Sequence, residues 1–175
     1  MQNLKLVVLF VWVGVFSCGE KPAMMADKTK WMTLDQVADS LQQQKRPVLI
    51  DVYTDWCGWC KVMDRKTYSN KKVAAYLQEK FYTTKFNAEG KQAIAWNGKQ
   101  YQYNASYGAH DFATWLTHGQ LSYPTTVIIT PDGEPQPIPG YLTPSELELI
   151  VKYFGEGHYG KLDFGAFQKS FKSSW

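Results

Sequence analysis

The feature that most constrains this chain is an apolar segment that leads into two closely spaced cysteines. Residues 47–53 are Pro-Val-Leu-Ile-Asp-Val-Tyr, and residues 56–61 are Trp-Cys-Gly-Trp-Cys-Lys. The apolar segment predicts a buried strand, and a helical pattern follows it directly. Cys57 would then lie at a helix N-terminus, where free N–H groups and the helix dipole favour a thiolate, with Cys60 one turn later. This geometry predicts a reversible disulfide.

The N-terminal residues have the layout of an export signal. Residues 6–16 form an apolar run that is too short to span a membrane, so we expect residues 1–17 to be a signal peptide. The run ends at Ser17-Cys18, which resembles a bacterial lipobox, where the cysteine is acylated. An ordinary signal peptide or anchor with an incidental cysteine is the alternative. We expect an exported protein on the periplasmic side of a bacterial membrane, attached through a lipid on Cys18, with residues 18–30 as a tether.

The cysteine count separates this chain from disulfide-stabilised exported proteins. If Cys18 carries a lipid, Cys57 and Cys60 are the thiols that remain, so no structural disulfide framework can form. Zinc needs four ligands, but there is no second cysteine pair and the histidines lie far along the chain. Haem attachment would need a histidine where Lys61 stands. The pattern favours thiol–disulfide chemistry, with no metal and no cofactor beyond the Cys57–Cys60 disulfide.

Helix and strand signals alternate from Thr33, which opens a capping box ahead of a helix. Whether Trp31 before it lies on a short first strand stays open. After the cysteine pair, apolar residues predict two helical pieces that meet near Ser69-Asn70, where Asn70 can cap the second piece. Residues 81–87 then predict another strand. A strand, helix, strand series with one crossover implies parallel pairing with the strand at 47–53.

The second half of the chain predicts a hairpin, further helices and an edge strand. Asn97-Gly98 is a hairpin signal, and residues 111–118 have the pattern of a short helix. Residues 123–130 predict a strand that turns back into residues 134–139. Prolines alternate in that last segment and remove the N–H groups on one side, which an edge strand tolerates and a central strand does not. Two more helices are predicted, one from Pro144 behind a capping box and one around Phe164, Phe167 and Phe171.

From about Pro47 to Phe154 the chain resembles thioredoxin, and more closely the exported bacterial thioredoxin-like proteins with a WCGWC-type site. The matching features follow in order: Asp51 six residues before Cys57, the Trp-Cys-x-x-Cys-Lys motif, Lys85 in the next strand, Tyr123-Pro124-Thr125 at the family's cis-proline, and Gly140 before the last helix. The resemblance implies the thioredoxin fold, an α/β domain with a central mixed sheet flanked by helices. We expect this domain over residues 31–175, with an insertion at about 91–120 and an extra helix in the tail 155–175.

The resemblance also implies roles for the residues around the thiols. Cys57, the more exposed and more acidic thiol, attacks a substrate disulfide, and Cys60 resolves the mixed disulfide. Asp51 stands inside an apolar strand, so burial should raise its pKa, and it can take the proton of Cys60. A solvent-exposed acid at a strand end is the alternative. Lys85 either pairs with Asp51 or is a plain surface lysine, and the sequence leaves this open.

Substrate binding is expected on one rim of the site. If Pro124 is cis, it places the backbone of Tyr123 against the thiols, where a substrate strand can add by β-pairing. Trp56, Trp59 and Tyr123 would form an aromatic rim around Gly58. Packing of these aromatic rings into the core is the alternative, chiefly for Trp56.

These features favour an exported thiol–disulfide oxidoreductase acting on protein thiols and disulfides. Gly58 and Trp59 stand between the cysteines without a histidine to stabilise a thiolate, which argues for a reductant or a moderate potential rather than a strong oxidant. An exported reductant needs a membrane thiol donor or acceptor as partner. The net charge of +3, without a Lys/Arg cluster, argues against nucleic acid. The alternative is a redox-inert binding or chaperone-like module on a thioredoxin scaffold.

Overall fold

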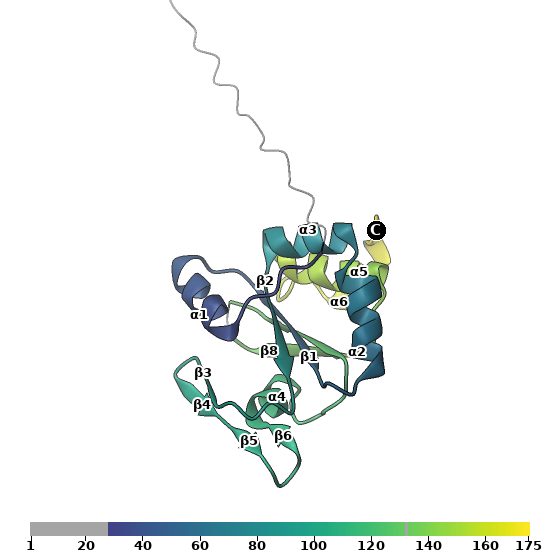
Figure 1. Ribbon diagram of the computed structural model, residues 1–175. Helices are drawn as coiled ribbons and strands as arrows, with labels where there is room; N and C mark the ends of the chain where they lie inside the picture. Colours follow the sequence, from purple (N-terminus) through teal and green to yellow (C-terminus); the bar gives the residue numbers. More distant parts are fainter. Residues whose placement is uncertain (1–27, 132) are drawn as a thin grey trace, which may run out of the picture.

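A four-stranded mixed sheet forms the centre of the protein (Figure 1). The structure is a computed structural model that describes residues 28–131 and 133–175. The strand order is β2-β1-β7-β8, in which β1 and β2 run parallel and the other neighbours run antiparallel. This confirms the central mixed sheet. The strands are β1 (Val48–Tyr53), β2 (Tyr82–Asn87), β7 (Thr125–Ile129) and β8 (Pro135–Pro139).

Helices cover both faces of this sheet. They are α1 (Leu34–Gln43), α2 (Gly58–Met63), the π-helical turn η1 (Asp64–Tyr68), α3 (Lys71–Lys80), α4 (Asp111–Leu116), α5 (Pro144–Gly155) and α6 (Phe164–Ser170). Three predicted helix starts are confirmed, because the side chains of Thr33, Asn70 and Thr143 each accept a hydrogen bond from the first turn that follows. Thr33 and Thr143 form complete capping boxes.

Alternate residues of β1 point into two different apolar clusters. Ile50 and Val52 pack with α1 and α4 on one face, whereas Leu49 packs with η1, α3 and α5 on the other. Asp51 lies two residues after Leu49 on the strand, so its side chain points to the same face of the sheet as that of Leu49. Its carboxylate therefore faces the layer that holds the helix carrying the cysteines.

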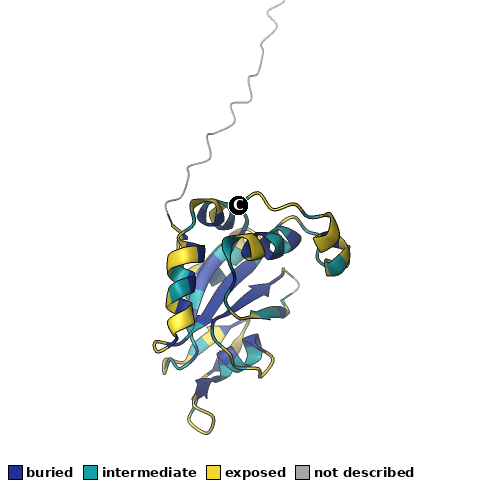
Figure 2. Cartoon of the chain, turned by 90° about the vertical axis from the view of Figure 1, so that its right-hand side faces the viewer, coloured by how far each residue is buried: buried dark blue, intermediate teal, exposed yellow. Residues whose placement is uncertain are grey.

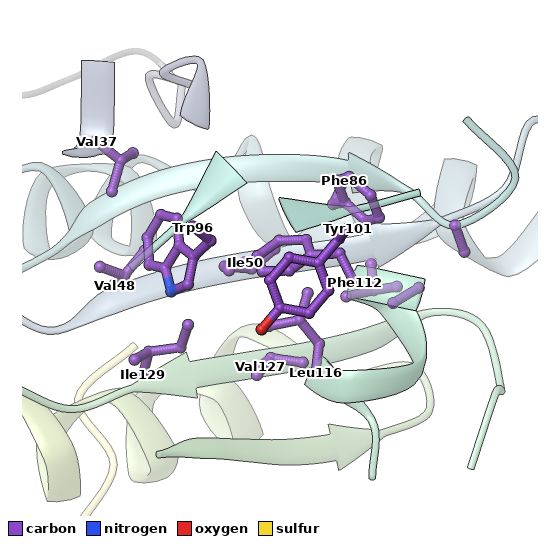
Figure 3. Packing of buried hydrophobic residues seen from close by; sticks show 13 residues of the cluster. Val37, Val48, Ile50, Phe86, Trp96, Tyr101, Phe112, Leu116, Val127 and Ile129 are labelled. Atoms are coloured by element: carbon purple, nitrogen blue, oxygen red, sulfur yellow. The ribbon is translucent and has the colours of Figure 1, made fainter. Parts of the chain in front are cut away.

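The expected insertion folds as two small antiparallel ladders ahead of α4. β3 (Ile94–Trp96) and β4 (Lys99–Tyr101) form the predicted hairpin, closed by Asn97 and Gly98 at φ of 49° and 75°. A second ladder of β5 (Tyr103–Asn104) and β6 (Ala109–His110) was not predicted. Aromatic rings of the insertion complete the core on the sheet face that Ile50 lines (Figure 3): Trp96, Tyr101 and Phe112.

The outer position of β8 confirms the predicted edge strand. The N–H of Gly140 donates to the carbonyl of Pro124 at 2.8 Å, which makes this pair a hydrogen-bonded one. Along an antiparallel ladder, hydrogen-bonded pairs alternate with pairs that are not hydrogen-bonded. The prolines of β8 therefore fall at the positions that are not hydrogen-bonded, where the backbone groups point away from β7. The three prolines are Pro135, Pro137 and Pro139.

The folded part of the chain begins earlier than the expected boundary at Trp31. Thr29 is buried, and its backbone N–H and side-chain hydroxyl both donate to the carbonyl of Tyr68, at 3.1 and 2.7 Å. These bonds fasten Thr29 to η1, within the segment that the sequence analysis assigned to a tether. Met32 forms a single parallel bridge to Thr84, so a short first pairing does exist beside Trp31.

The predicted signal peptide and the lipid site at Cys18 lie outside the described residues. Within the described part of the chain, no helix is long and apolar enough to cross a bilayer.

The C-terminal residues return from α6 to α5 (Figure 2). Glu148 on α5 is fully buried and accepts hydrogen bonds from Lys152, from the Ser173 hydroxyl, and from the backbone N–H groups of Ser174 and Trp175. These bonds, formed with a charged acceptor, fasten the tail to the domain. The tail is thus a folded extension of the domain, as expected from its aromatic spacing.

Candidate functional site

The two cysteines of the motif form a disulfide at the start of α2. Their sulfurs are 2.10 Å apart and their Cα atoms 5.3 Å apart. Cys57 is the N-cap of α2, and its sulfur accepts a hydrogen bond from the N–H of Cys60 at 3.0 Å. In this disulfide-bonded state Cys57 and Cys60 are almost equally buried, at 4% and 3% exposed, so the greater exposure expected of Cys57 remains a prediction for the reduced protein. The sulfur of Cys57 is turned into the first helical turn, where it is bonded to Cys60.

A buried acid and a lysine lie side by side on the parallel strands behind the disulfide. Asp51 and Lys85 are neighbours in the register of β1 and β2, and Lys85 Nζ is 3.1 Å from Asp51 Oδ2. Asp51 is 1% exposed, so the alternative of a solvent-exposed acid is wrong. Lys85 directs its hydrogen bonds to the two carboxylate oxygens of Asp64, at 2.6 and 2.8 Å. The sequence left the pairing of Lys85 open, and the structure shows one ammonium group between two carboxylates.

Burial has a large effect on Asp51. It raises the pKa of this carboxyl group from 3.8 to about 6, although the positive charge of Lys85 lowers it and the negative charge of Asp64 adds to the rise. Burial lowers the pKa of Lys85, but the negative charges of Asp51 and Asp64 raise it by more, so the net shift is upward. At neutral pH the site therefore holds an ionised but destabilised carboxylate that can accept a proton.

A neutral phenol stands next to this acid. Tyr68 is buried, and its hydroxyl lies 3.2 Å from the hydroxyl of Thr126, which is paired with Asp51 in the sheet. Burial raises the pKa of Tyr68 well above 10, and the charge of Asp51 raises it further. Tyr68 therefore stays protonated and does not compete with Asp51 as a base.

The predicted rim residues are exposed beside the cysteine motif or in contact with it through Trp56. The Tyr123–Pro124 peptide bond is cis, as the resemblance implied. Trp56 and Trp59 are 67% and 62% exposed, so neither ring packs into the core. Trp56 contacts Tyr123 edge-on, with ring centroids 5.9 Å apart. Gly58 is exposed, and a Cβ added to it would meet no atom within 4 Å, so the surface at Gly58 is open.

Two further residues support this rim and were not predicted. The indole N–H of Trp56 donates to Glu89 Oε1 at 3.0 Å, which fixes the orientation of an otherwise exposed ring. The ring of Tyr141 lies 5.5 Å from that of Trp59. Tyr141 directly follows Gly140, which the sequence analysis singled out, so its position next to that glycine was the available signal.

Metal ligands do not gather in the part of the chain that the structure describes. Residues 28–131 and 133–175 contain no group of three or more His, Cys, Asp or Glu side chains that could hold an ion. His110 has a packing role: it is fully buried, and its Nδ1 accepts the N–H of Phe112 at 3.1 Å to cap α4.

Comparisons of the sequence agree with this arrangement. The model of the thioredoxin-like domain family matches residues 34–155. A segment of 46 residues is 39% identical to the thiol:disulfide interchange protein DsbD of Vibrio vulnificus and covers 26% of this chain. The corresponding segment is 37% identical in the DsbD of Ralstonia nicotianae. The match spans only 8% of the length of each of these relatives.

Solved structures show the same fold at low sequence identity. A DsbH oxidoreductase superposes with a TM-score of 0.55 at 12% identity, over 81% of this chain and 94% of that one. A thioredoxin-fold protein of Helicobacter pylori gives 0.53 at 16% identity, over 71% and 79%. A putative disulphide-isomerase of Bacteroides thetaiotaomicron gives 0.51 at 20% identity, over 78% and 100%. These likenesses establish the fold.

Proposed function

Because the chain belongs to the thioredoxin-like domain family, we propose that it is an exported thiol–disulfide oxidoreductase that exchanges disulfides with polypeptides. The observation that carries this proposal is the Cys57–Cys60 disulfide at the start of α2, with the Tyr123–Pro124 loop brought to it by the contact between Trp56 and Tyr123. A strand, a cysteine pair at a helix start and a proline loop together provide a nucleophile, a resolving thiol and a place for substrate backbone.

The proposed reduction runs through a mixed disulfide. In the reduced protein, the Cys57 thiolate attacks one sulfur of the substrate disulfide, and the other substrate sulfur leaves as a thiolate. Cys60 then loses its proton and attacks the Cys57 sulfur, which releases the second substrate thiolate. Two electrons pass to the substrate, and the protein ends with the Cys57–Cys60 disulfide seen in the structure. Oxidation of a substrate dithiol follows the same steps in reverse.

We assign the proton transfer to Asp51. Its pKa of about 6 leaves the carboxylate ionised at neutral pH yet close enough to neutrality to hold a proton briefly. Lys85 keeps that pKa from rising further and joins Asp51 to Asp64. In this proposal Lys85 and Asp64 are positioning residues, because they act through Asp51.

The substrate segment would add to the backbone beside Pro124 and pack between the exposed rings. Trp56, Trp59 and Tyr123 supply apolar area, and Gly58 leaves the approach to the disulfide open. Aromatic rings with one apolar face and a polar tip suit such contacts, because they bury large area at low entropy cost.

The redox direction and the location are also proposals. No histidine stands between the cysteines, which favours a reductant or a moderate potential. Such a protein must regain electrons from a membrane thiol partner. The similarity of one segment to thiol:disulfide interchange proteins supports such an exchange of electrons between thiols. We propose that a lipid on Cys18 holds the domain at the periplasmic side of a bacterial membrane.

Turnover of a disulfide-bonded polypeptide tests the function. With dithiothreitol as electron donor and insulin as substrate, the protein should accelerate reduction, Cys57→Ser should abolish the acceleration, and Cys60→Ser should accumulate a mixed disulfide. Cys18→Ser is the matched control and should keep full activity. Unchanged turnover in Cys57→Ser would overturn the proposal. Substrate binding without turnover in the wild type would favour a redox-inert binding module instead.

A further inference from the structure

A second cavity lies away from the disulfide, where the C-terminal tail meets the edge of the sheet. It has a volume of about 450 Å³ and lies between β8, the C-terminal half of α5 and the segment that leads into α6. This volume falls within the usual range for sites that bind small molecules. None of its lining residues belongs to the redox site, so the thiol chemistry does not explain it.

Aromatic rings form the walls of this cavity. Tyr159 and Phe164 both contact Tyr153 nearly at right angles, at centroid distances of 6.1 and 5.2 Å. Phe154, which also lines the cavity, stacks against Tyr159 with ring centroids 4.9 Å apart. Among the described residues, no ring contact joins Tyr159 to Phe164 directly. Both rings therefore rest against Tyr153, which is buried and forms the floor of the cavity.

A carboxylate also lines this cavity. Asp163 lines the cavity and is exposed, and its Oδ1 accepts the N–H of Ala166 at 3.1 Å as the cap of α6. In the described part of the chain, Oδ2 has no hydrogen-bond partner and remains available to a ligand. Burial raises the pKa of Tyr153, and the negative charge of Asp163 raises it further, so the field of this carboxylate reaches the aromatic floor.

The neighbouring strand edge offers acceptors and no donors. Pro137 of β8 lines the cavity, and the three prolines of β8 direct their backbone groups away from β7. Proline has no N–H, so this edge presents carbonyl oxygens alone. Donors at the cavity come only from side chains that also line it, the amide of Gln136 and the hydroxyls of its tyrosines. A cation would meet partial negative charge from the ring faces, the carbonyl oxygens and Asp163.

We propose that this cavity binds a quaternary ammonium group. Aromatic faces attract cations through the ring quadrupole, and cages of several rings are the usual receptors for quaternary ammonium ligands. Such a group lacks N–H donors, so it matches a site lined by aromatic rings, apolar side chains and a single carboxylate. The ligand is either a free choline-like compound or a choline headgroup of a lipid, and the two share this chemistry.

Titration with choline, followed by amide NMR signals of residues 159–166, tests the proposal. Choline should shift these signals in a saturable way, and 3,3-dimethyl-1-butanol, its neutral isostere, should bind at least about tenfold more weakly. Equal affinity for the two compounds would overturn the proposal, because a merely apolar cavity does not distinguish them. Absence of saturable binding up to about 10 mM choline would overturn it too.

Two variants keep the fold and remove the attraction. Asp163→Asn retains an N-cap side chain but loses the charge, and Phe164→Leu retains apolar volume but loses the ring. Each should weaken choline binding by about five- to thirtyfold while the other amide signals of α6 stay in place. If both variants bind choline as tightly as the wild type, the cage assignment is wrong. A Cys57→Ser/Cys60→Ser protein should bind choline unchanged, which separates this test from that of the redox function.

Vesicles identify the source of the ligand. If the wild type cosediments with phosphatidylcholine vesicles more strongly than Phe164→Leu does, the ligand is a lipid headgroup. Equal cosedimentation, together with choline binding in solution, assigns a free quaternary ammonium compound.

Discussion

Replacement of Asp51 by asparagine should stabilise the oxidised protein at alkaline pH. Asp51 is 1% exposed, and neither of its oxygens has a hydrogen-bond partner in the described structure, although Lys85 lies within ion-pair distance. A carboxylate in such a place pays a desolvation cost that asparagine avoids. Lys85 keeps its hydrogen bonds to Asp64 after the change, so no unpaired ammonium is left behind.

The size of the effect follows from the pKa of Asp51. Burial raises it from 3.8 to about 6, roughly two units, and one unit corresponds to about 1.36 kcal/mol, so the ionised form costs about 3 kcal/mol of folding free energy. Because the folded pKa is raised, the cost is full above about pH 6 and disappears as the pH falls below 3.8. Effects that do not depend on pH, such as the shape of the amide, cancel when two pH values are compared.

Urea denaturation, followed by circular dichroism at pH 8 and pH 4, provides the measurement. The free energy of unfolding of Asp51→Asn, relative to wild type, should be higher at pH 8 than at pH 4 by about 2 to 3 kcal/mol. Asp55→Asn, at an exposed position just after β1, is the control and should change stability by less than about 0.5 kcal/mol at both pH values. An equal effect of Asp51→Asn at the two pH values would refute the assigned burial cost.

Three further changes test other parts of the structure. Asp64→Asn removes a negative charge that raises the pKa of Asp51, and it frees Lys85 to bond to Asp51. The carboxyl pKa of Asp51, followed by NMR, should therefore fall, and an upward shift would contradict the assigned network. Glu148→Ala should lower the free energy of unfolding by about 2 kcal/mol and speed hydrogen exchange at residues 171–175, because it removes the acceptor that holds the tail. Unchanged hydrogen exchange would show that other contacts hold the tail. Phe112→Ala should cost about 3 to 5 kcal/mol in urea denaturation, since this ring joins the insertion to the main core, and a cost below about 1 kcal/mol would mean that the insertion is independent.

Local signals predicted most of the architecture. Capping residues such as Thr33 and Thr143 mark helix starts by a specific hydrogen bond, and Asn97-Gly98 marks a turn that requires positive φ. The alternate prolines of β8 placed that strand at the sheet edge, because each deletes a donor that a central strand needs. Such features depend on a few neighbouring residues and hence are visible in the sequence.

The parts that were missed depend on contacts between distant segments. Asp64 meets Lys85 because the helix after the cysteines passes into a π-helical turn at η1, and tertiary contacts of Thr67 and Tyr68 accompany that turn. Thr29 belongs to the fold through two hydrogen bonds to the carbonyl of Tyr68, 39 residues away. No local pattern encodes these partners.

The candidate site was predicted in a similar way. The spacing of Cys57 and Cys60 is local and predicted a disulfide, whereas the buried acid Asp51 beside it was implied by the family resemblance and its apolar neighbours. The supports of the rim, Glu89 and Tyr141, come from other segments, and their contacts with Trp56 and Trp59 became visible only in three dimensions.

The reduction potential of the Cys57–Cys60 pair tests the central claim most directly. Equilibration of the purified protein in dithiothreitol or glutathione redox buffers, followed by alkylation of free thiols, gives the fraction reduced at each potential. We predict a reversible two-electron transition between about −270 and about −180 mV, the range of thioredoxin-like reductants and moderate exchangers. A disulfide that stays intact below about −300 mV would behave as a structural crosslink and would contradict the account.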